Sequence, residues 1–184
     1  MRIFAVFAAV FLFAAVPCTI GQKLKKPVVA PASPKRGVTP PCSNAGLTPD
    51  EVADILAAHN KARHDVQVAS VEWDCGLANT AAAWVKQGVA GHSDTAFGEN
   101  VFVSADDDDK ATKAVERWRD EKEHWHNKRG GCDPGKTCTH YTQVVWQSTR
   151  KIGCAVNRHA TGKWKMILVC NYDVAATTGR AYPE

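Results

Sequence analysis

The chain has 184 residues, enough for one sizeable domain, and its 23 basic and 19 acidic side chains leave a formal net charge of only +4. This near balance of charge argues against a protein that binds nucleic acids through the phosphate backbone, because such proteins are strongly basic. The seven cysteines are the more informative part of the composition, because cysteine-rich small domains are typical of the secretory route.

The first 21 residues have the pattern of a secretory signal peptide. Arg2 precedes an apolar run over 3–16, and small residues follow as far as Gly21. The run is shorter than the roughly 20 residues that a membrane-spanning helix needs, and no later stretch is long and apolar enough to span a bilayer. We therefore expect residues 1–21 to be removed and the protein to be secreted as an extracellular, soluble chain.

Residues 22–41 differ in composition from the rest of the chain. They hold five basic residues and five prolines but no acid, so we expect an extended leader without a core. One domain follows over 42–184, where 17 basic and 19 acidic side chains give a net charge of −2. The leader could contact polyanions such as cell-wall or matrix polymers, but a solubilising linker is the simpler interpretation.

Six cysteines remain once Cys18 is removed with the signal peptide. An even number in an oxidising compartment predicts three disulfides, although six cysteines allow 15 pairings. A zinc cluster is the alternative, and the lack of any C-x-x-C pair in the sequence argues against it. The six are Cys42, Cys75, Cys132, Cys138, Cys154 and Cys170.

Three helices are predicted in the first part of the domain. The first starts after Thr48, because Pro49 follows at the first helical position and Glu51 completes a capping box. The second is expected over 76–89. The third follows the acidic run 106–109, whose charges suit a helix N-terminus. Its side chains expected to face the core are Ala111, Ala114, Val115, Trp118 and Trp125.

Three strands are predicted next, over 141–147, 152–158 and 164–171, because each run is rich in Val, Ile, Trp or Tyr. The short segment 160–162 joins the last two like a hairpin connection, which places Cys154 opposite Cys170 or its neighbour. Alternation puts the following side chains on one face: Trp164, Met166, Leu168 and Cys170, with Cys154 and Val156. Helices first and strands last suggest a sheet covered by helices on two sides.

A series of short motifs runs through the domain in a fixed order. Towards the C-terminus these are His140-Tyr141-Thr142-Gln143-Val144-Val145-Trp146, Gly153-Cys154 and Cys170-Asn171-Tyr172. Upstream they are His59-Asn60-x-x-Arg63, Trp73-Asp74, His92-Ser93, Gly98-Glu99-Asn100 and Trp118-x-x-Glu121. In type, order and spacing they resemble the CAP family of cysteine-rich secretory, antigen 5 and pathogenesis-related 1 proteins. The resemblance covers about residues 48–182 and implies an α+β fold, a three-layer α-β-α sandwich.

The same resemblance implies a shallow cleft with two histidines and two glutamates, which here are His92, Glu99, Glu121 and His140. Two neutral imidazoles, His92 and His140, could hold Zn²⁺ or another divalent cation weakly. A metal-activated water beside either glutamate would make a hydrolase, but no nucleophile accompanies the four residues. The third interpretation is scaffolding, in which the four side chains only satisfy one another across the sandwich.

The segment 122–139 resembles the family's loop implicated in sterol binding. Its Trp125 could pack over an apolar ligand, or it could close the core beneath the third helix. His124 and His126 flank this ring; we expect both to be solvated, with an accessory metal role as the alternative.

The family pattern also implies the disulfides Cys132–Cys138 and Cys154–Cys170, which leaves Cys42 with Cys75. The function expected from the resemblance is that of a secreted binding protein rather than an enzyme, acting in host interaction or defence. Its expected partners are a sterol, a fatty acid or another small apolar ligand, or an extracellular protein. We expect a monomer or a weak dimer, with no nucleic-acid partner and no membrane span.

Overall fold

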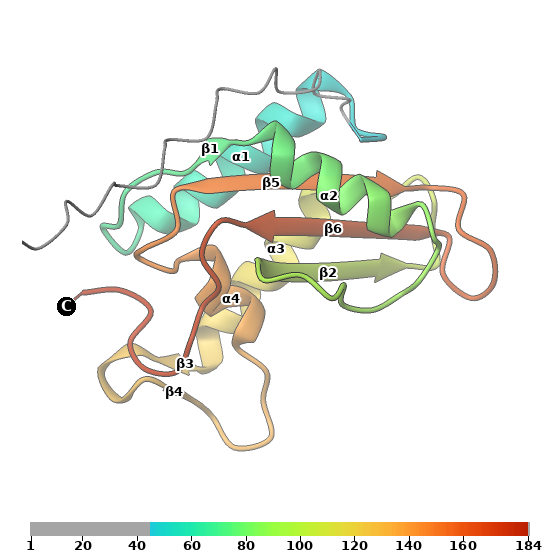
Figure 1. The fold of residues 1–184 in the computed structure, drawn as a ribbon. Coiled ribbons are helices and arrows are strands. Elements are labelled where there is room, and N and C mark those ends of the chain that lie inside the picture. The colour runs from blue at the N-terminus through green and yellow to red at the C-terminus, as the bar shows by residue number, and fades with distance from the viewer. Residues whose placement is uncertain (1–44, 184) are drawn as a thin grey trace, which may run out of the picture. The chain divides into compact units, whose positions relative to one another are not determined.

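The computed structural model describes residues 45–183 of the chain. The predicted signal peptide, the predicted leader and Cys42 lie outside the described residues. A four-stranded sheet with the order β1-β5-β6-β2 forms the middle of the described part (Figure 1). Its strands are β1 (Glu72–Trp73), β2 (Gly98–Ser104), β5 (Lys151–Asn157) and β6 (Met166–Tyr172). β1 runs parallel to β5, and the other neighbours are antiparallel.

Helices cover both faces of this sheet. In Figure 1, α2 lies in front of β5 and β6, whereas α1 and α3 lie behind the sheet. The helices are α1 (Pro49–His64), α2 (Cys75–Val85), α3 (Thr112–Asp120) and the short α4 (Thr139–Val144). Between α3 and α4 come two 3₁₀ turns and a two-stranded ribbon: η1 (Glu121–His124), β3 (Trp125–His126), η2 (Asn127–Arg129) and β4 (Gly131–Cys132). The predicted three-layer α-β-α sandwich is confirmed.

The start of α1 follows directly from the sequence. The Thr48 hydroxyl accepts the Glu51 N–H at 3.2 Å, and a Glu51 carboxylate oxygen accepts the Thr48 N–H at 2.9 Å. This reciprocal capping box satisfies N–H groups that have no partner within the helix, so the helix begins at Pro49 as predicted.

The two faces of the hairpin β5–β6 pack into two separate clusters because side chains alternate along a strand. Cys154, Val156, Met166 and Leu168 belong to the core shared with α1 and α3, and Ala155, Ile167 and Val169 belong to the cluster under α2. Cys154 pairs with Cys170 in register, and the two form a disulfide with their Cα atoms 4.0 Å apart. Trp164 does not share this face: it precedes the strand and packs on the cluster under α2.

Two strand predictions need correction. Residues 141–147 do not form a strand; most of this run lies in α4, whose Tyr141, Thr142, Gln143 and Val144 are all buried. Conversely, β2 was not predicted, and it forms an edge of the sheet next to β6. Strands therefore occur both before and after α3, rather than only at the end of the chain.

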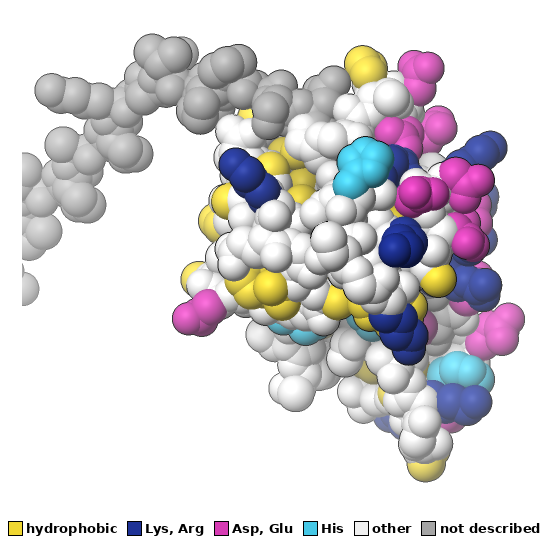
Figure 2. Space-filling view, turned by 90° about the vertical axis from the view of Figure 1, so that its right-hand side faces the viewer, with side chains coloured by type: hydrophobic (Ala, Val, Ile, Leu, Met, Phe, Trp, Pro, Cys, Tyr) yellow, Lys and Arg dark blue, Asp and Glu magenta, His cyan; other side chains and the backbone are white. Residues whose placement is uncertain are grey.

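Charged side chains are mixed on the surface. Figure 2 shows the end of the molecule that carries the β5–β6 connection, where acidic and basic side chains lie interspersed. Two of the recorded ion pairs are Lys113 with Asp109 at 2.7 Å and Arg158 with Glu51. Among residues 45–183, no helix is long and apolar enough to cross a membrane.

Candidate functional site: a cleft with two histidine–glutamate pairs

The first pair lies where the loop before β2 meets that strand. His92 Nδ1 donates to Glu99 Oε1 at 2.9 Å, and the Ser93 N–H donates to the same oxygen at 2.8 Å. The Ser93 hydroxyl donates to the other carboxylate oxygen. The Asn171 amide satisfies its neighbours when its nitrogen donates to Glu99 Oε2 at 3.2 Å. Glu99 is thus saturated with donors and nearly buried, while 64% of the His92 side chain is exposed.

The second pair joins the end of α3 to α4. His140 Nδ1 donates to Glu121 Oε1 at 2.6 Å, and Glu121 Oε2 accepts the backbone N–H groups of His140 and Tyr141 at 3.0 and 3.1 Å. The His140 ring also stacks on Trp118, with ring centroids 6.2 Å apart and planes 14° from parallel. The imidazole is therefore fixed by its own helix, by a carboxylate and by an aromatic face.

A buried polar chain lies behind His140. Asn100 donates from Nδ2 to the His140 carbonyl and to the Tyr172 hydroxyl, both at 3.1 Å. The Tyr172 hydroxyl lies 2.9 Å from His59 Nε2. His59 Nδ1 is 2.9 Å from the Ile55 carbonyl and must donate to it, so Nε2 accepts from Tyr172. Burial lowers the pKa of His59 to about 4 and raises the pKa of Tyr172, so both side chains stay neutral.

The C-terminal strap, residues 173–183, forms the remaining wall. The Gln143 side chain donates to the Val174 carbonyl at 3.0 Å and accepts the Ala176 N–H at 2.7 Å. Further along, the Asn127 side chain accepts the Ala181 N–H at 3.0 Å and donates to the Tyr182 carbonyl at 2.7 Å. Two amide side chains therefore hold the strap against α4 and the β3–β4 ribbon.

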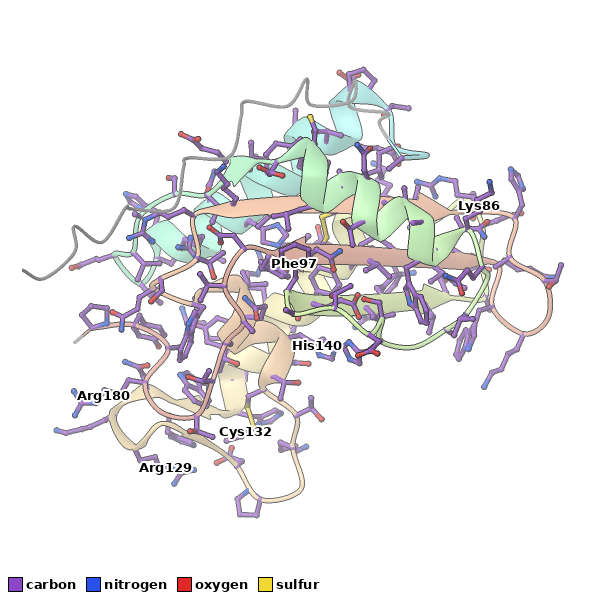
Figure 3. All side chains as sticks on the ribbon, viewed as in Figure 1. Lys86, Phe97, Arg129, Cys132, His140 and Arg180 are labelled. Carbon is purple, nitrogen blue, oxygen red and sulfur yellow. A yellow bond between two sulfur atoms is a disulfide. The ribbon has the colours of Figure 1, made fainter. Side chains whose placement is uncertain are left out.

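Together these segments enclose an open cleft of about 600 Å³. His92, Glu99 and His140 line it, and Glu121 supports His140 from behind. Figure 3 shows His140 on α4 and Phe97 beside the start of β2. The other lining side chains are Ser93, Asn100, Thr139, Thr142, Gln143, Ala175, Ala176, Thr177 and Thr178.

The donor set decides what cation this cleft could hold. Each imidazole uses Nδ1–H to bind its glutamate, which fixes the tautomer that leaves Nε2 as a free lone pair. Among the described residues, no group of three or more His, Cys, Asp or Glu side chains is arranged to hold a metal ion. His92 and His140, which line the same cleft, offer two imidazole nitrogens as ligands for a weakly bound cation whose coordination water would complete. They fall short of the three protein ligands typical of catalytic zinc.

The loop histidines lie apart from this cleft lining. His126 Nε2 is 2.7 Å and His124 Nδ1 is 3.4 Å from the Asp133 carboxylate, and Arg129 lies 3.3 Å from it. The bond from His126 contributes most to holding the pKa of Asp133 below its usual value. Both histidines remain partly exposed, so they pair with Asp133 at the surface instead of being only solvated.

Trp125 is half-buried and packs against the larger core cluster, and its indole N–H lies 3.4 Å from Asn127 Oδ1. The ring therefore closes one side of the core while keeping an exposed edge. The loop that carries it is fastened by the disulfide Cys132–Cys138, which confirms that pairing. Cys75 is also disulfide-bonded, and its expected partner Cys42 lies outside the described residues.

Sequence reasoning did not assign a role to several side chains that shape the cleft. Asn100 and Gln143 lie inside motifs that resemble those of the CAP family, so the sequence shows their positions but not their hydrogen-bonding partners. Trp118 was predicted to face the core, and it does so by stacking on His140. Phe97 carried no signal, because a lone aromatic residue before an unpredicted strand follows no pattern.

Comparison with known proteins agrees with this geometry. Residues 56–172 match the model of the CAP family, described as the cysteine-rich secretory protein family. The chain belongs to this family. Pathogenesis-related protein 1B of Nicotiana tabacum, a similar CAP protein, is 41% identical over 124 residues, which is 65% of this chain and 73% of that protein.

Solved structures of CAP proteins share the fold. A crystal structure of NaASP2 with Zn²⁺ aligns with a TM-score of 0.66 and 27% identity, over 78% of this chain and 90% of that one. The venom allergen-like protein 4 of Schistosoma mansoni aligns with a TM-score of 0.63 and 24% identity, over 74% of this chain and 96% of that one.

Proposed function

We propose that this chain is a secreted CAP protein of host interaction or defence that works by binding, and that the His92–His140 cleft is its binding site. A divalent cation such as Zn²⁺ is among its weak ligands. One observation carries the proposal: both imidazoles direct Nδ1 to a glutamate, so both leave Nε2 open for a ligand. The NaASP2 structure with Zn²⁺ supports cation binding in a relative of the same fold.

The same contacts argue against hydrolysis. The Glu99 and Glu121 oxygens already accept N–H and O–H groups, so neither carboxylate is free to take a proton from water. The Ser93 hydroxyl donates to Glu99 rather than to an imidazole, which removes the serine–histidine arrangement that would activate it.

Calorimetric titration with Zn²⁺ tests the proposal. We expect weak binding by the mature protein that weakens further as the pH falls, because protons compete for the imidazole nitrogens. The double variant His92→Ala with His140→Ala should no longer bind Zn²⁺. His159→Ala, which removes an exposed histidine that does not line the cleft, is the matched control. Equal affinity in the double variant and the wild type would place the cation elsewhere, with His124 and His126 as the first candidates.

Carriage of a sterol or fatty acid through the loop 122–139 is the second candidate function. The partly exposed Trp125 ring favours it, because an aromatic edge at the surface can pack on an apolar ligand. Trp125→Ala should then weaken binding of a labelled sterol by about 1–3 kcal/mol and leave Zn²⁺ binding unchanged. Trp164→Ala removes another half-buried indole far along the chain and is the control. Equal effects of the two changes, or no sterol binding by the wild type, would refute this candidate.

A further inference from the structure

The lining of the His92–His140 cleft has a chemical character that narrows its ligand. Among residues 45–183, no Lys or Arg side chain lines it, and the one carboxylate that does, Glu99, is saturated by donors of the protein. A cleft for a phosphate, sulfate or carboxylate group would need cationic donors, which form the strong bonds to such anions. The lining therefore does not suit an anionic ligand.

An extended apolar ligand is also disfavoured. The apolar side chains of the lining are Phe97, Ala175 and Ala176, and polar side chains surround them. Binding sites for apolar molecules are lined predominantly by hydrophobic side chains. One phenylalanine and two alanines cannot cover a lipid tail along its length.

The polar groups are instead those that bind hydroxyls. The side chains of Thr139, Thr177 and Thr178 are exposed in the cleft, and none has a hydrogen-bonding partner within residues 45–183. Each hydroxyl both donates and accepts, and the Nε2 atoms of His92 and His140 add two acceptors. The arrangement matches a ligand that carries many neutral hydroxyl groups.

Phe97 supplies the remaining feature. Among residues 45–183 it is one of the few large apolar side chains left exposed, at 40%, and it lies at the cleft beside the start of β2 (Figure 3). The flat face of an aromatic ring packs well on the C–H face of a sugar ring, which is apolar while its edge carries hydroxyls. The cleft volume of about 600 Å³ is within the range of small-ligand sites and leaves room for more than one sugar ring.

From these observations we infer that the cleft binds a neutral oligosaccharide, stacked on Phe97 and hydrogen-bonded by the threonine hydroxyls and the two imidazoles. This inference rests on the proposed function, in that it takes the His92–His140 cleft as the binding site. It adds the chemical class of the ligand and a residue, Phe97, that cation binding does not require.

The test is a calorimetric or NMR titration of the mature protein with chitotetraose and cellotetraose, and separately with Zn²⁺. We expect Phe97→Ala to weaken binding of the neutral saccharide at least about tenfold and to leave Zn²⁺ binding unchanged. Phe97→Trp should retain saccharide binding, because it keeps an aromatic face. Val89→Ala, which removes an apolar side chain of similar exposure from the same loop without lining the cleft, should have no effect.

The outcomes separate the two proposals. If the wild type binds Zn²⁺ through its histidines but neither saccharide, the inference is overturned and the proposed function stands. If a saccharide binds through Phe97 without any Zn²⁺ binding, the inference stands and the cation is removed from the proposed function. Tighter binding of a heparin tetrasaccharide or of palmitate at this cleft than of both neutral saccharides would overturn the inference.

Discussion

Glu121 fixes His140 through both carboxylate oxygens, because Oε1 accepts the ring Nδ1–H at 2.6 Å while Oε2 accepts the backbone N–H at 3.0 Å. Oε2 also accepts the Tyr141 N–H at 3.1 Å. These two N–H groups open α4 and have no partner within it, so the carboxylate acts as the helix cap. One side chain thus couples the existence of α4 to the orientation of a cleft imidazole.

This coupling predicts a double effect of Glu121→Gln. The amide replaces one accepting oxygen by a donor that faces another N–H, so we expect the free energy of unfolding to fall by about 1–3 kcal/mol. Zn²⁺ affinity should fall as well, because the His140 ring loses its fixed orientation. Urea unfolding and calorimetry measure both quantities. Glu123→Gln, an exposed change two residues away, should alter neither, and equal effects of the two changes would contradict the coupling.

A second prediction concerns the disulfide of Cys75, whose expected partner Cys42 lies outside the described residues. We expect Cys42 to pair with Cys75, which would tie the start of the domain to the N-terminus of α2. Proteolysis of the secreted protein under non-reducing conditions, followed by mass spectrometry, should yield a linked pair of peptides that contain these two residues. A peptide that links Cys42 to Cys170 would contradict this prediction and the register of β5 with β6.

The parts of the fold that the sequence predicted well have local causes. The Thr48–Glu51 capping box marks α1 because its partners lie three residues apart. The hairpin pattern placed Cys154 opposite Cys170 or its neighbour, the family resemblance implied the disulfide between them, and the register of β5 with β6 brings the two together. The two histidine–glutamate pairs became visible through the family resemblance, because no local pattern brings Glu121 to a histidine 19 residues later.

The failures have tertiary causes. Residues 141–147 are rich in β-branched and aromatic side chains, which favour a strand, yet burial on all sides and the Glu121 cap stabilise a short helix there. The sequence does not predict β2, because only its central residues, Val101 to Val103, are apolar. Antiparallel pairing with β6 along its whole length stabilises the strand, although its sequence has no strand pattern over that length.

Gly153 provides a test of how closely α2 approaches the sheet. A Cβ atom at this position would overlap the Ala78 backbone nitrogen and lie 2.5 Å from the Asp74 carbonyl oxygen. Neither backbone atom can move without shifting the helix, so Gly153→Ala should cost about 3 kcal/mol or more, or prevent secretion. Gly91→Ala, where a Cβ meets nothing within 4 Å, is the matched control. If the free energy of unfolding of Gly153→Ala lay within about 0.5 kcal/mol of the wild-type value, α2 would not approach the sheet this closely.

The buried His59 predicts how stability depends on pH. Burial first, and the nearby Arg63 second, lower its pKa from 6.5 to about 4, although its bond to the Ile55 carbonyl acts in the opposite direction. As the pH falls through 6.5 the unfolded chain takes up a proton on this ring, whereas the folded chain does so only near pH 4. The folded state should therefore lose about 3 kcal/mol between pH 6.5 and 4. Asp74, whose pKa is held below 3.8 by the Leu77 N–H and Lys151 against the effect of burial, loses its contribution only below this window.

Urea unfolding at several pH values measures the slope, and an NMR titration of the His59 ring measures the pKa itself. His59→Gln should flatten the slope within this window even if it lowers stability throughout, and the exposed change His64→Gln should keep it. A wild type that is equally stable at pH 6.5 and 4.5, or a slope that survives in His59→Gln, would show that this imidazole does not carry the pH dependence.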